Sequence, residues 1–141
     1  MRPVKTSSTF VLCVVLLSQL IGCGPSLPEL PQGTYTTTIA SADLANGASP
    51  VLPERWDLNF ADDSLFTVSK DGELVVKGTY GVVEDQLTFN DEEGVLACRA
   101  GQAIGIYKWA LDDNALSLTA IEDQCDGRKA ILAAHPFSRL P

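Results

Sequence analysis

The sequence predicts an all-β domain, a single antiparallel up-and-down β-barrel of about eight strands, with one short helix near the C-terminus as an option. Three observations support this. Apolar and polar residues alternate with a period of two from residue 33 onward, which is typical of strands with one buried face. Tight turns separate the alternating segments. Seven or eight such segments suit a small closed barrel.

The alternation is clearest in the second segment, Arg55-Trp56-Asp57-Leu58-Asn59-Phe60, where the apolar residues share one face. Asp71-Gly72 then marks a type I′ hairpin turn. In the fourth segment we expect one inner face formed by Leu74, Val76, Tyr80 and Val82. The expected strands lie around residues 33–39, 55–60, 66–69, 74–82, 86–89, 107–111 and 116–119.

The end of the chain, residues 126–141, lacks a clear period. Residues 130–132 suit either a short helix or the start of a last strand that closes the sheet. Pro136 favours an edge strand or a bulge, because proline cannot donate to a strand ladder.

A Gly-x-Tyr pattern occurs three times, at Gly33-Thr34-Tyr35, Gly78-Thr79-Tyr80 and Gly105-Ile106-Tyr107. Each copy falls in or beside an expected strand. We interpret the repeat as shared strand packing rather than as a box of ligand-binding tyrosines.

The N-terminus has the pattern of a secretory signal. Arg2 and Lys5 precede an apolar run over residues 10–21, which is too short to span a bilayer and suits a signal peptide. The run ends in Leu20-Ile21-Gly22-Cys23, which resembles the lipobox of bacterial lipoproteins. The alternative is an ordinary secreted protein in which Cys23 falls at this place by chance.

The lipobox resemblance implies cleavage before Cys23, a diacylglyceryl group on its thiol and a further acyl chain, such as palmitate, on its amino group. Two or more chains anchor a protein stably to the lipid bilayer. Gly24 follows the cysteine, which by analogy favours the outer membrane if the bacterium has two membranes, and otherwise the outer face of the cell membrane. We expect a signal peptide over 1–22, a lipidated cysteine with a proline-rich tether over 23–32, and the barrel domain over 33–141.

The charge excludes several classes of partner. Residues 1–22 contain two of the ten basic residues and none of the eighteen acidic ones, so the remaining 119 residues carry a formal charge of −10. Nucleic acid and anionic lipid surfaces repel such a chain. A chain of this length forms one domain, which we expect to be a monomer.

Two cysteines, Cys98 and Cys125, remain after Cys13 and Cys23 are assigned to the signal and the lipid. In an exported chain we expect them to form a disulfide. A redox pair or a metal site are the alternatives, but there is no C-x-x-C motif, and a single distant histidine cannot complete a zinc site. In an up-and-down barrel the loops after the fifth and seventh strands meet at one rim, so the topology agrees with this pairing.

Residues 33–139 resemble the lipocalin-like (calycin-type) domains of small bacterial lipoproteins. The motifs that carry the resemblance are Gly33-Thr34-Tyr35, Trp56-x-Leu58-x-Phe60, Gly78-Thr79-Tyr80, Tyr107-x-Trp109 and Asp123-x-Cys125-x-x-Arg128. Lipocalins have a tryptophan in the first motif and a late arginine packed over it. Here Tyr35 replaces the tryptophan, and Arg128 or Arg139 could supply the arginine.

The expected barrel interior is aromatic, and its residues are the candidate ligand contacts. An eight-stranded barrel is either filled by side chains or retains room for one small ligand, and both alternatives remain open. We expect Trp56 and Trp109 to approach the axis from opposite sides. The candidates are Tyr35, Trp56, Phe60, Phe66, Tyr80, Phe89, Tyr107 and Trp109.

Nothing in the sequence points to catalysis, to a cofactor or to a metal. The acidic groups Asp62-Asp63, Asp91-Glu92-Glu93 and Asp112-Asp113 fall at expected turns, so we interpret them as solvated; an acidic face for a basic protein is the lesser alternative. Paired catalytic carboxylates need burial and a fixed separation. His135 is the single histidine, and no nucleophile motif accompanies it.

We therefore expect a membrane-anchored envelope lipoprotein that binds a small apolar ligand in its barrel and has no enzymatic activity. One alternative is a protein-binding module, such as an inhibitor of a cationic hydrolase, because a strongly acidic domain suits a basic target. Another is a structural envelope lipoprotein without a dedicated ligand.

Overall fold

The structure, a computed structural model, describes residues 29–40, 52–99 and 101–141. The expected signal peptide over 1–22, the lipidation site Cys23 and most of the connection over 40–53 therefore lie outside the described residues. No helix within the described ranges is long and apolar enough to cross a membrane.

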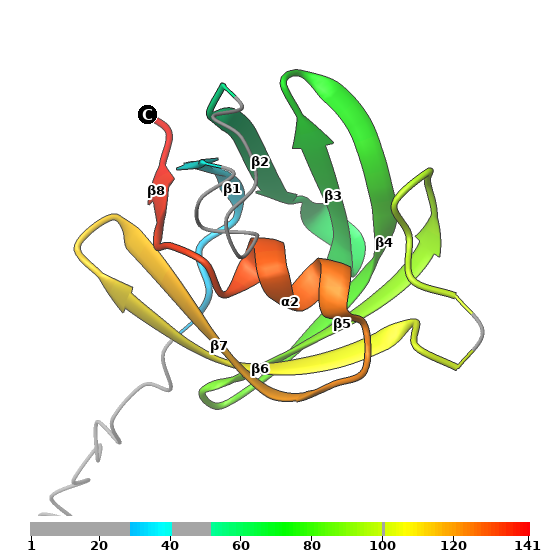
Figure 1. Ribbon diagram of the computed structural model, residues 1–141. Coiled ribbons are helices and arrows are strands. Elements are labelled where there is room, and N and C mark those ends of the chain that lie inside the picture. Colours follow the sequence, from blue (N-terminus) through cyan, green and yellow to red (C-terminus); the bar gives the residue numbers. More distant parts are fainter. Residues whose placement is uncertain (1–28, 41–51, 100) are drawn as a thin grey trace, which may run out of the picture.

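Eight antiparallel strands form a closed barrel in which each strand pairs with its neighbour in the sequence and the last strand pairs with the first (Figure 1). The all-β, up-and-down prediction is confirmed. The elements are β1 (Gly33–Ile39), β2 (Glu54–Phe60), the 3-10 turn η1 (Asp62–Ser64), β3 (Leu65–Lys70), β4 (Glu73–Val83), β5 (Gln86–Glu93), β6 (Ile104–Asp112), β7 (Ala115–Asp123), α2 (Asp126–Leu132) and β8 (Phe137–Arg139).

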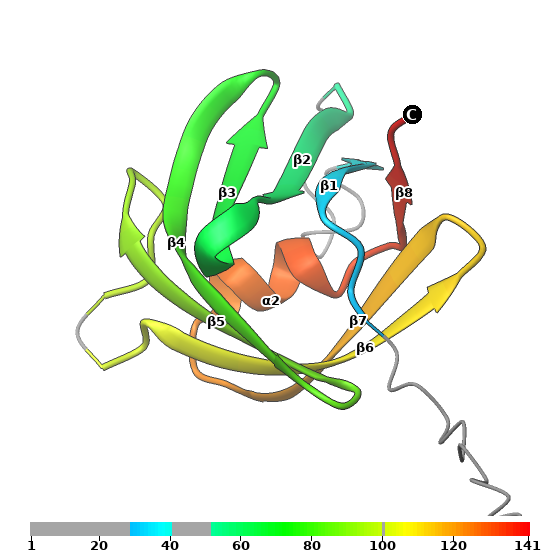
Figure 2. The same ribbon diagram turned by 180° about the vertical axis from the view of Figure 1, so that it is seen from behind.

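The end of the chain contains both of the elements that the sequence left as alternatives. Helix α2 lies across the opening that the strands enclose, as both Figure 1 and Figure 2 show. Strand β8 begins directly after Pro136 and closes the barrel by pairing with β1 and β7. The helix therefore covers one end of the barrel, and the strand completes its wall.

Strand β4 corrects one predicted face. Val68 pairs with Val76 and Ser69 pairs with Leu74, so Val75 is an extra residue, a β-bulge. A bulge shifts the in-and-out alternation. As a result Val75 is buried and Leu74 is exposed, whereas the plain period of two placed Leu74 on the inner face.

The residues just before β1 pack against the barrel. Leu30 is buried within the core cluster. The hydroxyl of Tyr35 donates to the Pro31 carbonyl at 2.8 Å, and Nη2 of Arg139 donates to the Gln32 carbonyl at 2.7 Å. The packed domain therefore begins before Gly33, at the end of the barrel opposite to α2, and these residues are not a free tether.

An aromatic layer fills the middle of the barrel. Its rings meet at centroid distances of 4.9 to 6.1 Å in edge-to-face or tilted pairs, the arrangement that aromatic quadrupoles prefer. The layer consists of Tyr35, Phe60, Phe66, Tyr80, Phe89 and Tyr107.

Candidate ligand-binding cavity

A cavity of about 300 Å³ lies between the aromatic layer and helix α2, and we call it the helix cavity. Its volume is at the lower end of the range of about 300–1,000 Å³ typical of small-molecule sites. Leu96 is half exposed and lines it, so the cavity reaches the surface. The lining residues are Trp56, Phe66, Val68, Val76, Asp91, Leu96, Gly127, Arg128, Ala130, Ile131 and Leu132.

The barrel is thus filled in one part and hollow in another. Among the eight candidate residues, Trp56 and Phe66 line the helix cavity. Phe66 also belongs to the aromatic layer, in contact with Phe89. The other members of that layer, Tyr35, Phe60, Tyr80, Phe89 and Tyr107, pack against one another and are not among the residues that line the cavity.

Trp109 and Trp56 lie at opposite ends of the barrel, not across one cavity. Trp56 pairs with Lys70, next to the turn that begins β4. The indole Nε1 of Trp109 donates to the carbonyl of Glu84, in the turn that ends β4, at 3.1 Å. The two rings are therefore separated along the barrel axis, and only Trp56 lines the helix cavity.

A buried ionic network fastens α2 over the barrel. Nε of Arg128 lies 2.7 Å from Oδ2 of Asp123, and Nη1 lies 3.0 Å from Oδ1 of Asp91. The hydroxyl of Tyr107 donates to Asp123 from the aromatic layer. Arg128 and Asp91 are buried, so Asp91 is not a solvated turn residue as the sequence suggested. Burial of these charges is tolerated because they are paired.

The network also shifts the proton affinities of its members. Burial by itself would raise the pKa of Asp123, but hydrogen bonds from Arg128, Tyr107 and the Cys125 N–H outweigh it and lower this pKa below its usual value. Burial, together with the hydrogen bond to the Asp123 carboxylate, raises the pKa of Tyr107. At neutral pH Asp123 is therefore a carboxylate and Tyr107 a neutral phenol.

Gly105 leaves the space that this network occupies. A Cβ atom at this position would lie 2.5 Å from Oδ2 of Asp123 and 2.7 Å from Nη2 of Arg128. Only a glycine lets both charged groups approach the strand so closely. The Gly-x-Tyr copy at 105–107 therefore supplies the gap with its glycine and a hydrogen-bond donor with Tyr107.

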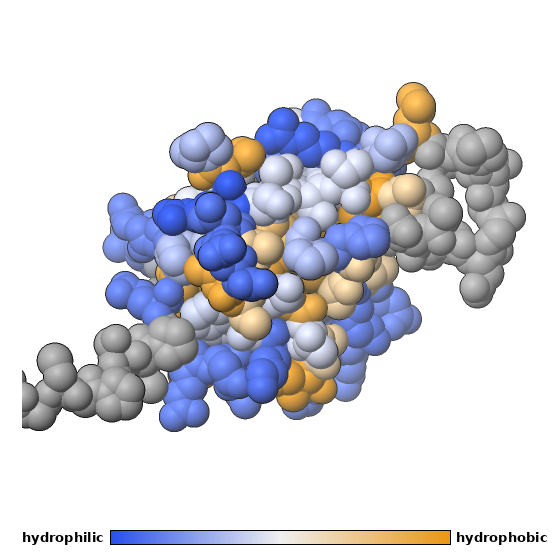
Figure 3. All heavy atoms as spheres, turned by 90° about the vertical axis from the view of Figure 1, so that its left-hand side faces the viewer, coloured by the Kyte–Doolittle hydropathy of each residue, from blue (hydrophilic) through white to orange (hydrophobic). Residues whose placement is uncertain are grey.

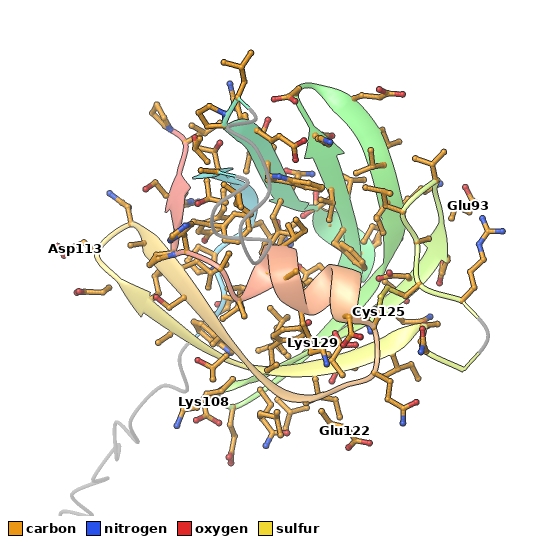
Figure 4. All side chains as sticks on the ribbon, in the orientation of Figure 1. Glu93, Lys108, Asp113, Glu122, Cys125 and Lys129 are labelled. Atoms are coloured by element: carbon orange, nitrogen blue, oxygen red, sulfur yellow. A yellow bond between two sulfur atoms is a disulfide. The ribbon has the colours of Figure 1, made fainter. Side chains whose placement is uncertain are left out.

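The Cys98–Cys125 disulfide joins the loop after β5 to the residue that precedes α2, in agreement with the prediction. Both amide groups bind the network, since Cys98 N–H donates to Oδ2 of Asp91 and Cys125 N–H donates to Oδ1 of Asp123, each at 2.8 Å. Figure 4 shows Cys125 at the start of α2, with Lys129 further along the helix. The disulfide and Arg128 hold the same end of the helix.

The structure assigns the two candidate late arginines to different places. Arg139 lies opposite Tyr35 in the register of β1 and β8. Arg128 lies instead in the network under α2. Of the eleven residues that line the helix cavity, nine were not among the sequence-predicted ligand contacts, and Asp91 and Leu96 are two of them. The run of three acidic residues was the one sequence feature that drew attention to Asp91, and no pattern indicated Leu96.

A second hollow of about 820 Å³ lies at the opposite end, where residues 29–32 meet the end of β4 and Arg139. Its lining includes Glu29, Glu84 and Arg139, so charged groups border it. On the face that carries β8 and the β6–β7 hairpin, hydrophobic residues are interspersed with hydrophilic ones (Figure 3). Because charged groups border the second hollow, the helix cavity is the better candidate for an apolar ligand.

Comparison of the chain with protein-family models, with curated proteins and with solved structures found no match. Within the described residues, no group of three or more His, Cys, Asp or Glu side chains could hold a metal ion. The function is therefore argued from the geometry of the site. The closed eight-stranded barrel is compatible with the lipocalin-like resemblance.

Proposed function

We propose that this protein is a lipid-anchored, monomeric protein of the bacterial cell envelope that binds a small, mostly apolar molecule in the helix cavity and catalyses no reaction. The observation that carries the binding proposal is the cavity itself, which lies between the aromatic layer and α2 and is lined mainly by aliphatic and aromatic side chains, with Asp91 and Arg128 as its charged residues. The lipobox-like Leu20-Ile21-Gly22-Cys23 supports the anchor.

The affinity expected for such a site is modest. Burying about 300 Å² of apolar ligand surface at about 25 cal/mol per Å² supplies about 7.5 kcal/mol before the cost of immobilising the ligand. A Kd of 1 μM corresponds to about −8.2 kcal/mol. We therefore expect a Kd weaker than about 1 μM for a ligand that makes only apolar contacts.

Two matched variants of β4 test the site. Val76→Phe adds bulk at a residue that lines the helix cavity, and Val83→Phe adds the same bulk at an exposed residue near the other end of the strand. The uncharged dye N-phenyl-1-naphthylamine, which brightens in apolar surroundings, reports occupancy in a fluorescence titration. We expect about one dye per chain for the wild type and for Val83→Phe, and at least tenfold weaker binding for Val76→Phe.

Thermal unfolding of both variants checks that each is folded, because overpacking a core costs about 1–3 kcal/mol. Equal dye binding by the folded Val76→Phe variant and the wild type would show that the dye binds elsewhere. A wild type that binds neither this dye nor any member of a panel of sterols, quinones and fatty alcohols would contradict the proposal.

A second candidate function is binding of a basic protein, for example inhibition of a cationic hydrolase. The observation in its favour is the formal charge of −10 on residues 23–141. Such binding would weaken steeply with salt, because charge attraction steers the encounter. Inhibition of a cationic lysozyme at low salt that disappears at high salt would support it, and the Val76→Phe variant would inhibit as well as the wild type.

A further inference from the structure

Arg128 lines the helix cavity, and four of its five N–H groups donate hydrogen bonds. Nε and Nη2 donate to Oδ2 and Oδ1 of Asp123 at 2.7 and 2.8 Å. Nη2 also donates to the carbonyl of Gln102 at 3.0 Å, and Nη1 donates to the carbonyl of Ala103 at 2.6 Å. Nη1 further lies 3.0 Å from Oδ1 of Asp91. Arginine has five N–H donors. The one that is not hydrogen-bonded lies on the side of the Asp91 carboxylate, so an acidic ligand would have to compete with Asp91 for it.

The local charge also disfavours an anion. One guanidinium lies between two carboxylates, those of Asp91 and Asp123, so the network carries a net charge of −1. The other nearby cation is Lys70, whose Nζ lies 5.7 Å from the ring centroid of Trp56 and 2.7 Å from Oε1 of Glu54. The ion pair of Lys70 and Glu54 carries no net charge. A ligand carboxylate would therefore be desolvated beside a net negative charge without a free cation to pair with.

The cavity does offer one unused donor. Within the described ranges of the chain, two buried polar atoms of lining residues have no hydrogen-bond partner: the indole Nε1 of Trp56 and Oδ1 of Asp91. The Asp91 oxygen still has an ion-pair contact with Arg128, whereas the Trp56 N–H is a donor with neither kind of partner. The indole of Trp109, at the other end of the barrel, has the Glu84 carbonyl as its acceptor. Buried donors in proteins are almost always paired, because an unpaired one is costly. Trp56 lines the cavity, so a bound molecule can supply the missing acceptor.

We propose that the helix cavity selects uncharged apolar molecules that carry one hydrogen-bond acceptor, such as a ketone or ester oxygen, and rejects anions of the same shape. Trp56 is the residue that determines this specificity, through its Nε1–H. The inference rests on the proposed function, since it requires that the cavity is occupied by an apolar ligand.

Three small competitors of matched size separate the two parts of the inference: 2-nonanone, nonane and octanoate, each displacing N-phenyl-1-naphthylamine from the full domain at pH 7. We expect 2-nonanone to compete and octanoate to be at least tenfold weaker. This comparison uses only the wild type and so does not depend on how well a variant folds.

The variants Trp56→Phe and Trp109→Phe then test the donor. Trp56→Phe keeps an aromatic ring and removes the N–H, so we expect 2-nonanone to bind about three- to tenfold more weakly, the range for loss of one hydrogen bond. Nonane should bind this variant as it binds the wild type. Trp109→Phe should change neither affinity, because Trp109 does not line the cavity.

The outcomes distinguish the inference from the function on which it rests. Octanoate that competes as well as 2-nonanone would overturn the selection against anions while leaving ligand binding intact. An equal effect of Trp56→Phe on 2-nonanone and on nonane would overturn the role of the Nε1–H. A wild type that binds neither the dye nor 2-nonanone would overturn the proposed function itself.

Discussion

Replacing Arg128 by methionine should destabilise the domain strongly, and more so at neutral pH than in acid. The guanidinium is the partner of two carboxylates, Asp91 and Asp123, and both Arg128 and Asp91 are buried. Methionine fills much of the same volume but leaves these carboxylates without a counterion. Breaking a buried ion pair by removing one partner costs about 3–5 kcal/mol, a large share of the roughly 5–15 kcal/mol that holds a domain folded.

The pH dependence follows from Asp123. Its pKa is lowered in the folded wild type, so its contribution to stability is present above the unfolded pKa of about 3.9 and is lost as the pH falls through the folded value. Without Arg128, burial opposes only the hydrogen bonds from Tyr107 and from the Cys125 N–H, and we expect the pKa of Asp123 to rise. In acid, Asp123 of the Arg128→Met variant takes up a proton and no longer needs a counterion. The difference in unfolding free energy between the wild type and the variant therefore becomes smaller towards pH 4.

Urea unfolding monitored by tryptophan emission at pH 7 and near pH 4 measures both effects. The matched control is Lys129→Met, the next residue of α2, whose partner Asp126 is almost fully exposed. An exposed pair of this kind contributes about 0–1 kcal/mol. If Arg128→Met and Lys129→Met lost similar free energies of unfolding, or if the loss from Arg128→Met did not depend on pH, the account of the network would be wrong.

Three further predictions concern other parts of the chain. Gly105→Ala should lower the melting temperature because its Cβ would lie 2.5 Å from Oδ2 of Asp123, whereas Gly81→Ala, with no atom within 4 Å, should be tolerated; equal melting temperatures would contradict this. Replacing Cys98 and Cys125 together by serine should cost up to about 3.6 kcal/mol in urea unfolding, from the loop-entropy relation for a separation of 27 residues; two alkylated thiols in the unreduced exported protein would refute the pairing. Cys23→Ser should abolish incorporation of a clickable fatty acid in cells, and equal labelling of the variant would exclude the lipid anchor.

The barrel could be predicted from the sequence because its physical cause is local. Alternation of the kind seen in residues 55–60 repeats along the chain, and short turns join each strand to the next. Closure by β8 was harder to foresee, since three residues carry no period of their own. Which residues at the start of β4 face the core was predicted wrongly, because the bulge at Val75 depends on the pairing of β4 with β3. No local sequence pattern reveals that pairing.

The site could be predicted only in part, for the same reason. Aromatic residues at alternating positions correctly indicated the interior, but their division between a packed layer and a cavity wall depends on where α2 lies. Asp91 stands in a run of three acids, which favours a solvated interpretation. It is buried because Arg128, distant in the sequence, lies beside it and because the Cys98 N–H donates to it.

The two ends of the barrel differ in a way that bears on the proposed anchor. Leu30 and the residues beside it pack at one end, next to the end of β4 and Arg139. The helix cavity, with the half-exposed Leu96, lies at the other end, where the disulfide and Arg128 hold α2. The seven residue steps from Cys23 to Leu30 span at most about 25 Å even when fully extended. In the lipid-anchored form that we propose, the chain therefore attaches at the end far from the cavity, so a ligand would enter from the side of the domain that is remote from its attachment point.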